Sequence, residues 1–252
     1  MKEKKIKEEE DMKFYVGMHM PSKADKVDRA FISVNVLSKR KSSFPVNEWI
    51  MDSGAFTTIS KYGGYPEPVS VYADQIRKWK NNGTLIAAVS QDYMCEEHML
   101  RRTGMNVRQH QRLTIERYDE LIKEDTGVYI MPVLQGYTPL SYVDHVKMYG
   151  DRLKPGMYVG VGSVCKRNSD PSSIVQVLKA IKKERPDLRL HGFGVKTTAL
   201  AWQEVRDNLE SADSMAWSYA ARFQKKNGND WRDAIAFQNK IKNQAVQLTL
   251  LD

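Results

Sequence analysis

Carboxylate and amide side chains follow short apolar runs at several points of the chain. Asp52 comes directly after the run Trp49 to Met51, Asp92 and Gln135 follow two later runs, and Asp213 lies inside another. A carboxylate can act as a nucleophile or as a general acid or base, and an amide can hydrogen-bond the edge of a flat heterocycle. Together these residues predict a pocket, although each one alone would also suit a cap or a turn.

Small residues accompany these polar side chains. Glycine allows tight turns and lets a flat ligand approach the backbone closely, so such residues suit the wall of a pocket. We interpret them as contacts for the substrate. The residues in question are Ser53, Gly136, Gly160, Val161 and Gly162.

The elements that would position these residues alternate between β-rich runs and amphipathic runs. Eight strands in this rhythm predict a single-domain (β/α)8 TIM-type barrel, whose active site lies at the carboxyl ends of the strands. An open doubly wound sheet is the alternative, but the chain has no Gly-x-Gly-x-x-Gly after its first strand and no Walker-type motif. The predicted strands are 14–19, 31–36, 49–53, 85–91, 128–134, 158–163, 190–195 and 212–217. The predicted helices are 71–81, 107–123, 139–149, 172–184, 197–208 and 231–247.

Composition limits the class of protein. With 252 residues, 41% of them hydrophobic, the chain can bury a large core, and we assign residues 13–252 to the barrel and residues 1–12 to a charged arm. No run approaches the roughly 18 apolar residues of a membrane span, so we expect a cytoplasmic protein without membrane contact. Two cysteines, Cys95 and Cys165, are too few for a disulfide framework or a cysteine-rich zinc site. We predict neither a metal nor a cofactor.

The net charge of +8 favours a polyanionic partner, for which nucleic acid is the obvious candidate. A solvated basic surface would produce the same balance. Basic residues just beyond the predicted strand ends are the candidate phosphate contacts. They are Lys166, Arg167, Lys196, Arg222, Lys225 and Lys226.

Five short motifs, in matching order from about residue 49 to residue 222, resemble the tRNA-guanine transglycosylase superfamily, and more closely its DpdA-like branch of 7-deazaguanine DNA transglycosylases. Residues 51–56 are similar to the family's Asp-Ser-Gly-Gly-Phe, with Ala55 in place of the second glycine. The others are residues 133–136, similar to Val-Gln-Gly; 159–163, similar to a Gly-Gly-Leu segment; 191–195, similar to Met-Gly-Val-Gly; and 212–215 with Arg222, which resemble the strand of the nucleophilic aspartate.

The resemblance implies roles for these residues. Asp213 would be the nucleophile and Asp52 the general acid/base, while Asp92, Gln135 and the backbone of residues 160–162 would bind a guanine-like base. No cysteine follows Cys165, so the zinc segment of the tRNA enzymes is missing, which favours DNA over tRNA. The implied partners are DNA, a 7-deazaguanine base such as preQ0 and, where needed, accessory modification proteins, in a bacterial host or encoded by its phage.

Other functions stay open from the sequence. An N-glycosidase or base-exchange enzyme acting on free nucleosides or nucleotides would need the same pocket, and an RNA-directed transglycosylase would need the same chemistry. A non-catalytic nucleic-acid-binding barrel would not place carboxylates at the strand ends, because they repel phosphate. A phosphate-binding metabolic barrel would need a clearer glycine-rich site than Gly192 and Gly194 offer.

Overall fold

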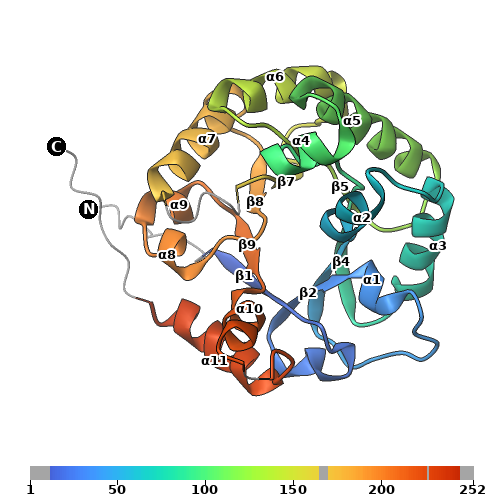
Figure 1. Cartoon of the computed structure of the whole chain (residues 1–252), viewed down its shortest axis with the longest axis vertical. Helices are drawn as coiled ribbons and strands as arrows, with labels where there is room; N and C mark the ends of the chain where they lie inside the picture. The colour runs from blue at the N-terminus through green and yellow to red at the C-terminus, as the bar shows by residue number, and fades with distance from the viewer. Residues whose placement is uncertain (1–11, 165–169, 226, 245–252) are drawn as a thin grey trace, which may run out of the picture.

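Parallel strands form a closed ring with helices around it (Figure 1), in a computed structural model that describes residues 12–164, 170–225 and 227–244. The strand order in the described part is β5-β4-β3-β2-β1-β9-β8-β7-β6. The strands are β1 (Lys13–Gly17), β2 (Arg29–Ser33), β3 (Glu48–Asp52), β4 (Thr84–Val89), β5 (Ile130–Met131), β6 (Val133–Leu134), β7 (Tyr158–Val161), β8 (Arg189–Gly192) and β9 (Ser211–Ser214). The predicted TIM-type barrel is confirmed.

The ring closes through a strand that Pro132 divides into β5 and β6. β5 pairs with β4, and β6 pairs with β7. Proline has no N–H to donate, but the Pro132 carbonyl still accepts a 2.9 Å hydrogen bond from the Gly160 amide. The single strand predicted over residues 128–134 therefore serves both neighbours and completes the barrel.

Helices cover the outside of the ring and, at one end, its mouth. Figure 1 shows α2, α4 and α10 nearer the centre of the ring than α3, α5, α6 and α7. The described helices are α1 (Val34–Leu37), α2 (Ala55–Tyr62), α3 (Val69–Trp79), α4 (Glu97–Thr103), α5 (Val107–Lys123), α6 (Pro139–Tyr149), α7 (Pro171–Glu184), α8 (Thr197–Leu200), α9 (Gln203–Asp207), α10 (Ala216–Phe223) and α11 (Trp231–Lys242), with the 3-10 turns η1 (Pro21–Lys26) and η2 (Gly150–Arg152).

Capping explains where the best-predicted helices begin. α5 and α6 match their predicted bounds, and each starts with a capping box, at Asn106 and Thr138 respectively. Several predicted bounds were wrong by a few residues, and three predictions were wrong in the type or continuity of the element. The second strand stops at Ser33, which caps α1 instead of continuing to Val36, and Trp217 belongs to α10 and not to the eighth strand.

The third wrong prediction is a continuous helix over residues 197–208, which breaks into α8 and α9. The buried Arg206 side chain explains the break, because its Nε donates a 2.7 Å hydrogen bond to the Leu200 carbonyl at the end of α8. A side-chain donor thus replaces the backbone N–H that a longer helix would supply.

Two apolar layers hold the barrel together. The larger lies between the strands and the outer helices, and the smaller fills the interior with side chains such as Tyr15, Phe31, Ile50 and Met131. A third cluster, which includes Ile59 and Met99, lies beneath α2 and α4. The packed interior leaves the carboxyl ends of the strands as the place for a ligand, as in other barrels.

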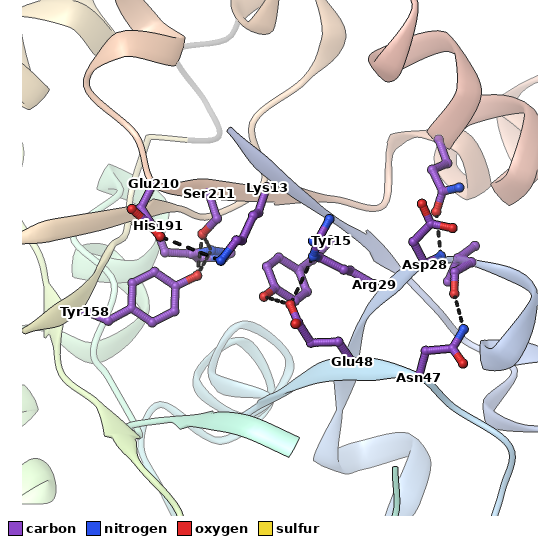
Figure 2. Close-up of polar contacts among 12 residues, drawn as sticks. Lys13, Tyr15, Asp28, Arg29, Asn47, Glu48, Tyr158, His191, Glu210 and Ser211 are labelled. Atoms are coloured by element: carbon purple, nitrogen blue, oxygen red, sulfur yellow. Dashed lines mark hydrogen bonds and ion pairs between the residues drawn. The ribbon is translucent and has the colours of Figure 1, made fainter. Parts of the chain in front are cut away.

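The amino ends of the strands carry ion pairs (Figure 2). The Tyr15 hydroxyl donates a 2.6 Å hydrogen bond to Glu48 Oε1, and Arg29 Nε donates to the same oxygen at 3.0 Å. Lys13 Nζ lies 3.9 Å from Glu210 Oε1. These carboxylates are all matched by cations, which is the usual arrangement at the stabilising end of a barrel.

The predicted charged arm falls outside the described residues, apart from Met12. None of the described helices combines the length and the apolar composition that a membrane span requires.

Candidate active site

Three aspartates meet at the carboxyl ends of the strands. Asp52 ends β3, Asp92 follows β4, and Asp213 lies in β9. Burial is the main cause that raises the pKa of Asp52 and of Asp92; in addition, the charge of Asp213 raises the pKa of Asp52, and the charge of Asp52 raises that of Asp92. The three carboxylates therefore act on one another electrostatically. The barrel therefore brings together the carboxylates that the sequence singles out.

Asp52 owes its place to the turn between β3 and α2. Gly54 has a φ of 72°, and a Cβ there would lie 2.3 Å from the Asn35 side chain, so any other residue would strain the backbone and displace Asn35. Burial raises the pKa of Asp52 to about 6, against hydrogen bonds from the Ser33 hydroxyl and from backbone amides. A carboxyl group with this pKa can both give and take a proton near neutral pH.

Asp92 belongs to a buried chain of hydrogen bonds. Gln135 Nε2 donates to Asp92 Oδ2, and Ser163 Oγ lies 2.7 Å from Gln135 Oε1 and 2.9 Å from Glu96 Oε2. Burial raises the pKa of Asp92 to about 7, with Asp52 and Glu96 adding to the rise and the Gln135 hydrogen bond opposing it. These hydrogen-bonded side chains place donors and acceptors side by side, as recognition of a purine edge requires.

Backbone geometry around Gln135 is tight. A Cβ at Gly162 would lie 2.1 Å from Gln135 Nε2, so this glycine makes room for the amide side chain. Ser163 adopts a φ of 57°, an unusual conformation for a residue other than glycine and one that often marks functional sites. Beside Ser163 and Glu96 lies a cavity of about 400 Å³, also lined by Tyr137, His98 and Arg101. Its size suits a small heterocycle.

Asp213 is held by two donors on one oxygen. The Gly194 amide lies 3.1 Å from Asp213 Oδ1, and His191 Nε2 lies 3.2 Å from the same atom. His191 is completely buried, and its Nδ1 lies 2.6 Å from Ser211 Oγ, which in turn contacts the Tyr158 hydroxyl (Figure 2). The contacts assign the tautomer: a carboxylate oxygen accepts, so Nε2 carries the proton and donates to Asp213, and Nδ1 accepts from the Ser211 hydroxyl.

The His191 ring is fixed by aromatic neighbours. It stacks on Phe31 with centroids 5.6 Å apart and planes 17° apart, and it meets the edge of Phe193 at 4.9 Å. Tyr15 and Tyr158 complete the surroundings at 6.0 Å each. The interior of the barrel therefore sets the orientation of a side chain that contacts Asp213.

The other predicted substrate contacts differ in whether their polar atoms already have hydrogen-bond partners within the protein. The amides of Gly160 and Gly162 donate within the sheet, to the Pro132 and Leu134 carbonyls, and the Val161 carbonyl accepts from the Phe193 amide. Gly136 packs against Tyr142. By contrast, the buried hydroxyl of Ser53 has no hydrogen-bond partner among the described residues, and neither has that of Ser90, which directly follows β4. A buried hydroxyl without a partner calls for an explanation, and a bound ligand would supply one.

The candidate phosphate contacts lie at the same end of the barrel where they are described. Lys196 precedes α8, and Arg222 and Lys225 are exposed at the end of α10. Arg222 Nη2 lies 2.8 Å from His19 Nε2 and 2.9 Å from Ser218 Oγ. Lys166, Arg167 and Lys226 lie outside the described residues.

The structure adds three residues to the predicted set: Glu96, Ser163 and His191. Ser163 and His191 belong to the motifs quoted above, so the sequence already indicates that they lie near the site. Their contacts depend on side-chain directions, which spacing alone does not give. Glu96 follows Asp92 by four residues, in a segment without regular structure, and no pattern singled it out.

Comparison with known families gives one decisive match. Residues 10–233 match the model of the family described as DpdA, DeoxyPurine in DNA protein A. The chain belongs to the DpdA family. Membership indicates an enzyme that acts on purine bases in DNA, with a general role in 7-deazaguanine modification. A search of curated proteins gives no significant match.

Proposed function

We propose that this DpdA-family protein exchanges guanine in DNA for a 7-deazaguanine base, such as preQ0, through a covalent bond between Asp213 and the sugar. The observation that carries the proposal is the difference between two of the aspartates. Asp213 is held on one oxygen by the Gly194 amide and by His191, whereas Asp52 has a pKa raised to about 6. One carboxylate suits nucleophilic attack and the other suits proton transfer.

In the first half-reaction, Asp213 Oδ2 attacks C1′ of the target nucleotide. Among the described residues no donor reaches Oδ2, since both donors bind Oδ1. The C1′–N9 bond breaks, its electron pair stays on N9, and the protonated form of Asp52 supplies the proton that makes neutral guanine. Two-carboxylate chemistry at an anomeric carbon follows this division of roles.

In the second half-reaction, the proton returns. The Asp52 carboxylate takes the N9 proton of the incoming base, N9 attacks C1′, and the C1′–O bond to Asp213 breaks, with its electron pair returning to the carboxylate. Protons and electrons balance without a metal or a redox cofactor in the scheme.

Base selection would depend on the chain Asp92–Gln135–Ser163–Glu96 and on the orphan Ser53 hydroxyl. As a carboxylate, Asp92 accepts the N–H donors of a guanine edge, and Gln135 holds it in place. Every base of this kind carries the same donor edge, so the same pocket can release guanine and admit the deazapurine. The cavity beside Ser163 would give the room for a substituent at position 7.

The test is nucleoside mass spectrometry after reaction in vitro. Purified protein is incubated with guanine-containing DNA and preQ0, and the DNA is digested to nucleosides. The proposal predicts a deazaguanine deoxynucleoside and an equal amount of released guanine. Parallel reactions with tRNA and with free deoxyguanosine separate the alternatives, because product in either of those arms, and none in DNA, would overturn the assignment.

A further inference from the structure

The two most exposed large apolar side chains of the described residues stand one turn apart on α10. Tyr219 is 70% exposed and Phe223 is 83% exposed. The opposite face of the same helix, with Trp217, Ser218 and Ala221, is buried. Packing of the fold therefore does not account for the two rings, and exposed apolar groups that lie together usually mark a binding surface.

The location of α10 connects this surface to the active site. The helix begins at Ala216, three residues after Asp213, and Figure 1 shows it nearer the centre of the ring than the outer helices. Met215, between the strand and the helix, lies beside Gly17, where an added Cβ would meet its side chain at 2.9 Å. A ligand that reaches Asp213 therefore passes close to α10.

The charge around the two rings favours an anionic ligand. Arg222 lies between them in sequence, and its guanidinium is held by His19 and Ser218. Burial and the charge of Arg222 lower the pKa of His19, so this imidazole accepts from the guanidinium and does not compete with it for an anion. Ser218 in turn donates to the Gly228 carbonyl at 2.6 Å. The arginine is thus fixed at the surface before any ligand binds.

A polar cavity adjoins Arg222. It has a volume of about 470 Å³ and is lined by His19, Arg222, Asn227, Gly228 and Asn229, with no carboxylate among these residues. The nearest acidic residue along the chain, Asp230, caps α11 and contacts Arg232. Neither Tyr219 nor Phe223 lines this cavity, but Arg222 does, and it belongs to the same helix as the two rings. The helix thus carries two aromatic side chains and a fixed cation that borders neutral hydrogen-bonding groups.

We propose that Tyr219 and Phe223 form a stacking platform for unpaired bases of the DNA strand next to the target, with Arg222 on the intervening phosphate. We refer to these three residues as the α10 platform. Single-stranded nucleic acid is bound in this way, by aromatic side chains on which successive bases stack and by cations along the backbone. A target base taken out of a duplex leaves neighbours without a stacking partner, and the platform would replace it.

The proposal rests on the proposed function for its choice of DNA, but it is tested separately, by binding. A fluorescein-labelled single strand of about ten nucleotides, a usual site size, is titrated with protein and followed by anisotropy. Tyr219→Ala and Phe223→Ala should each weaken binding about tenfold, in line with the loss of one stacked base. Tyr219→Phe and Phe223→Tyr should bind within about twofold of the parent, because they keep the rings.

The matched control is Ile122→Ala on α5, which removes another exposed apolar side chain, 48% exposed, far along the chain from the site. It should leave binding unchanged. A second readout uses 2-aminopurine beside the target guanine. The parent should quench its fluorescence on binding, and the double variant Tyr219→Ala/Phe223→Ala should not.

Three outcomes would overturn the platform: unchanged affinity in both alanine variants, an equal loss in Ile122→Ala, or a change in sedimentation without a change in DNA affinity, which would make the rings a contact between copies of the chain. Failure of the proposed function looks different. In that case the strand still binds through the rings, but no guanine is released from any DNA.

Discussion

The two ends of the barrel treat carboxylates in opposite ways. At the amino ends of the strands, Glu48 and Glu210 each face a lysine or an arginine. At the carboxyl ends, no lysine or arginine among the described residues pairs with Asp52, Asp92 or Asp213, whose donors are amides, hydroxyls and an imidazole. The lysines and arginines at the amino ends offset the charges of the carboxylates there. The neutral donors at the carboxyl ends hold their carboxylates without offsetting the negative charge.

The difference shows how one fold separates stability from reactivity. A carboxylate beside a cation is held in its charged form and gains stability, though the gain is small where solvent reaches the pair. Buried carboxylates without cations repel one another and lie in a poor solvent for charge, so their pKa values rise. Asp52 and Asp92 show this rise, to about 6 and about 7. A function at the carboxyl ends of the strands explains why the fold keeps carboxylates in surroundings that are unfavourable for their charge.

Among substitutions that leave the proposed nucleophile Asp213 in place, the largest effect is expected for Asp52→Asn. The amide cannot transfer a proton, so exchange should fall by a factor of about 10² to 10⁴, the usual contribution of general acid/base catalysis. In the parent, departure of guanine needs protonated Asp52, so that step should slow as pH rises above about 6. Single-turnover guanine release, measured from pH 5 to 8, checks both points. If Asp52→Asn keeps the parent's rate and pH profile, Asp52 takes no part in the reaction.

The next effect concerns His191, which in the proposed mechanism acts through Asp213 as a positioning residue. His191→Leu removes the Nε2 donor and should lower the rate constant of the first half-reaction by about 10- to 100-fold, as expected for a hydrogen bond to a charged group. His191→Gln places an amide donor near the same position and should recover much of the rate, with KM for DNA unchanged throughout. Equal rates in the Leu and Gln variants would mean that the imidazole serves only packing.

A smaller effect is expected for Asp92→Asn, which should weaken binding of the incoming base. The amide presents a donor where the carboxylate presents an acceptor, and one mispaired group in the pocket costs about 1 to 3 kcal/mol. The KM for preQ0 should rise accordingly, while guanine release from DNA under saturating conditions changes less. If Asp92→Asn exchanges bases as well as the parent does, the base does not bind at the Asp92–Gln135 chain.

The smallest effect is expected at the other end of the barrel. Glu48→Gln removes the charge that meets Arg29 but keeps an acceptor for Tyr15. We expect a loss of about 1 kcal/mol in the free energy of unfolding, because the pair is partly exposed to solvent. Urea denaturation measures the loss, and the exchange rate should stay at the parent's value. A large drop in exchange with unchanged stability would contradict the division between the two ends.

Much of the barrel could be predicted from the sequence, because its strands and outer helices follow local periodicity. The bounds of α5 and α6 were predicted fully, since capping residues mark where they begin. The break between α8 and α9 could not be predicted, because it depends on where the Arg206 side chain ends in three dimensions. The helix α1, which Ser33 caps, was not predicted either; a continuing strand was predicted in its place.

The sequence predicts where the three carboxylates lie in the barrel, but not which groups contact them. Strand ends place Asp52, Asp92 and Asp213 on one face of the barrel whatever the details of packing. Asp213 is contacted by the Gly194 amide and by His191, and the sequence alone does not single out either of them as its donor. Residues on neighbouring strands meet through the register of the sheet, and one sequence does not disclose that register.

The most direct test of the account is a search for the covalent intermediate. Protein and guanine-containing DNA are incubated without an incoming base, denatured and separated by size under denaturing conditions. The parent and Glu48→Gln should both give a slower-migrating protein–DNA adduct, and Asp213→Asn should give none while still binding DNA. An adduct that survives in Asp213→Asn but disappears in Asp52→Asn would contradict the account, because the nucleophile would then be Asp52.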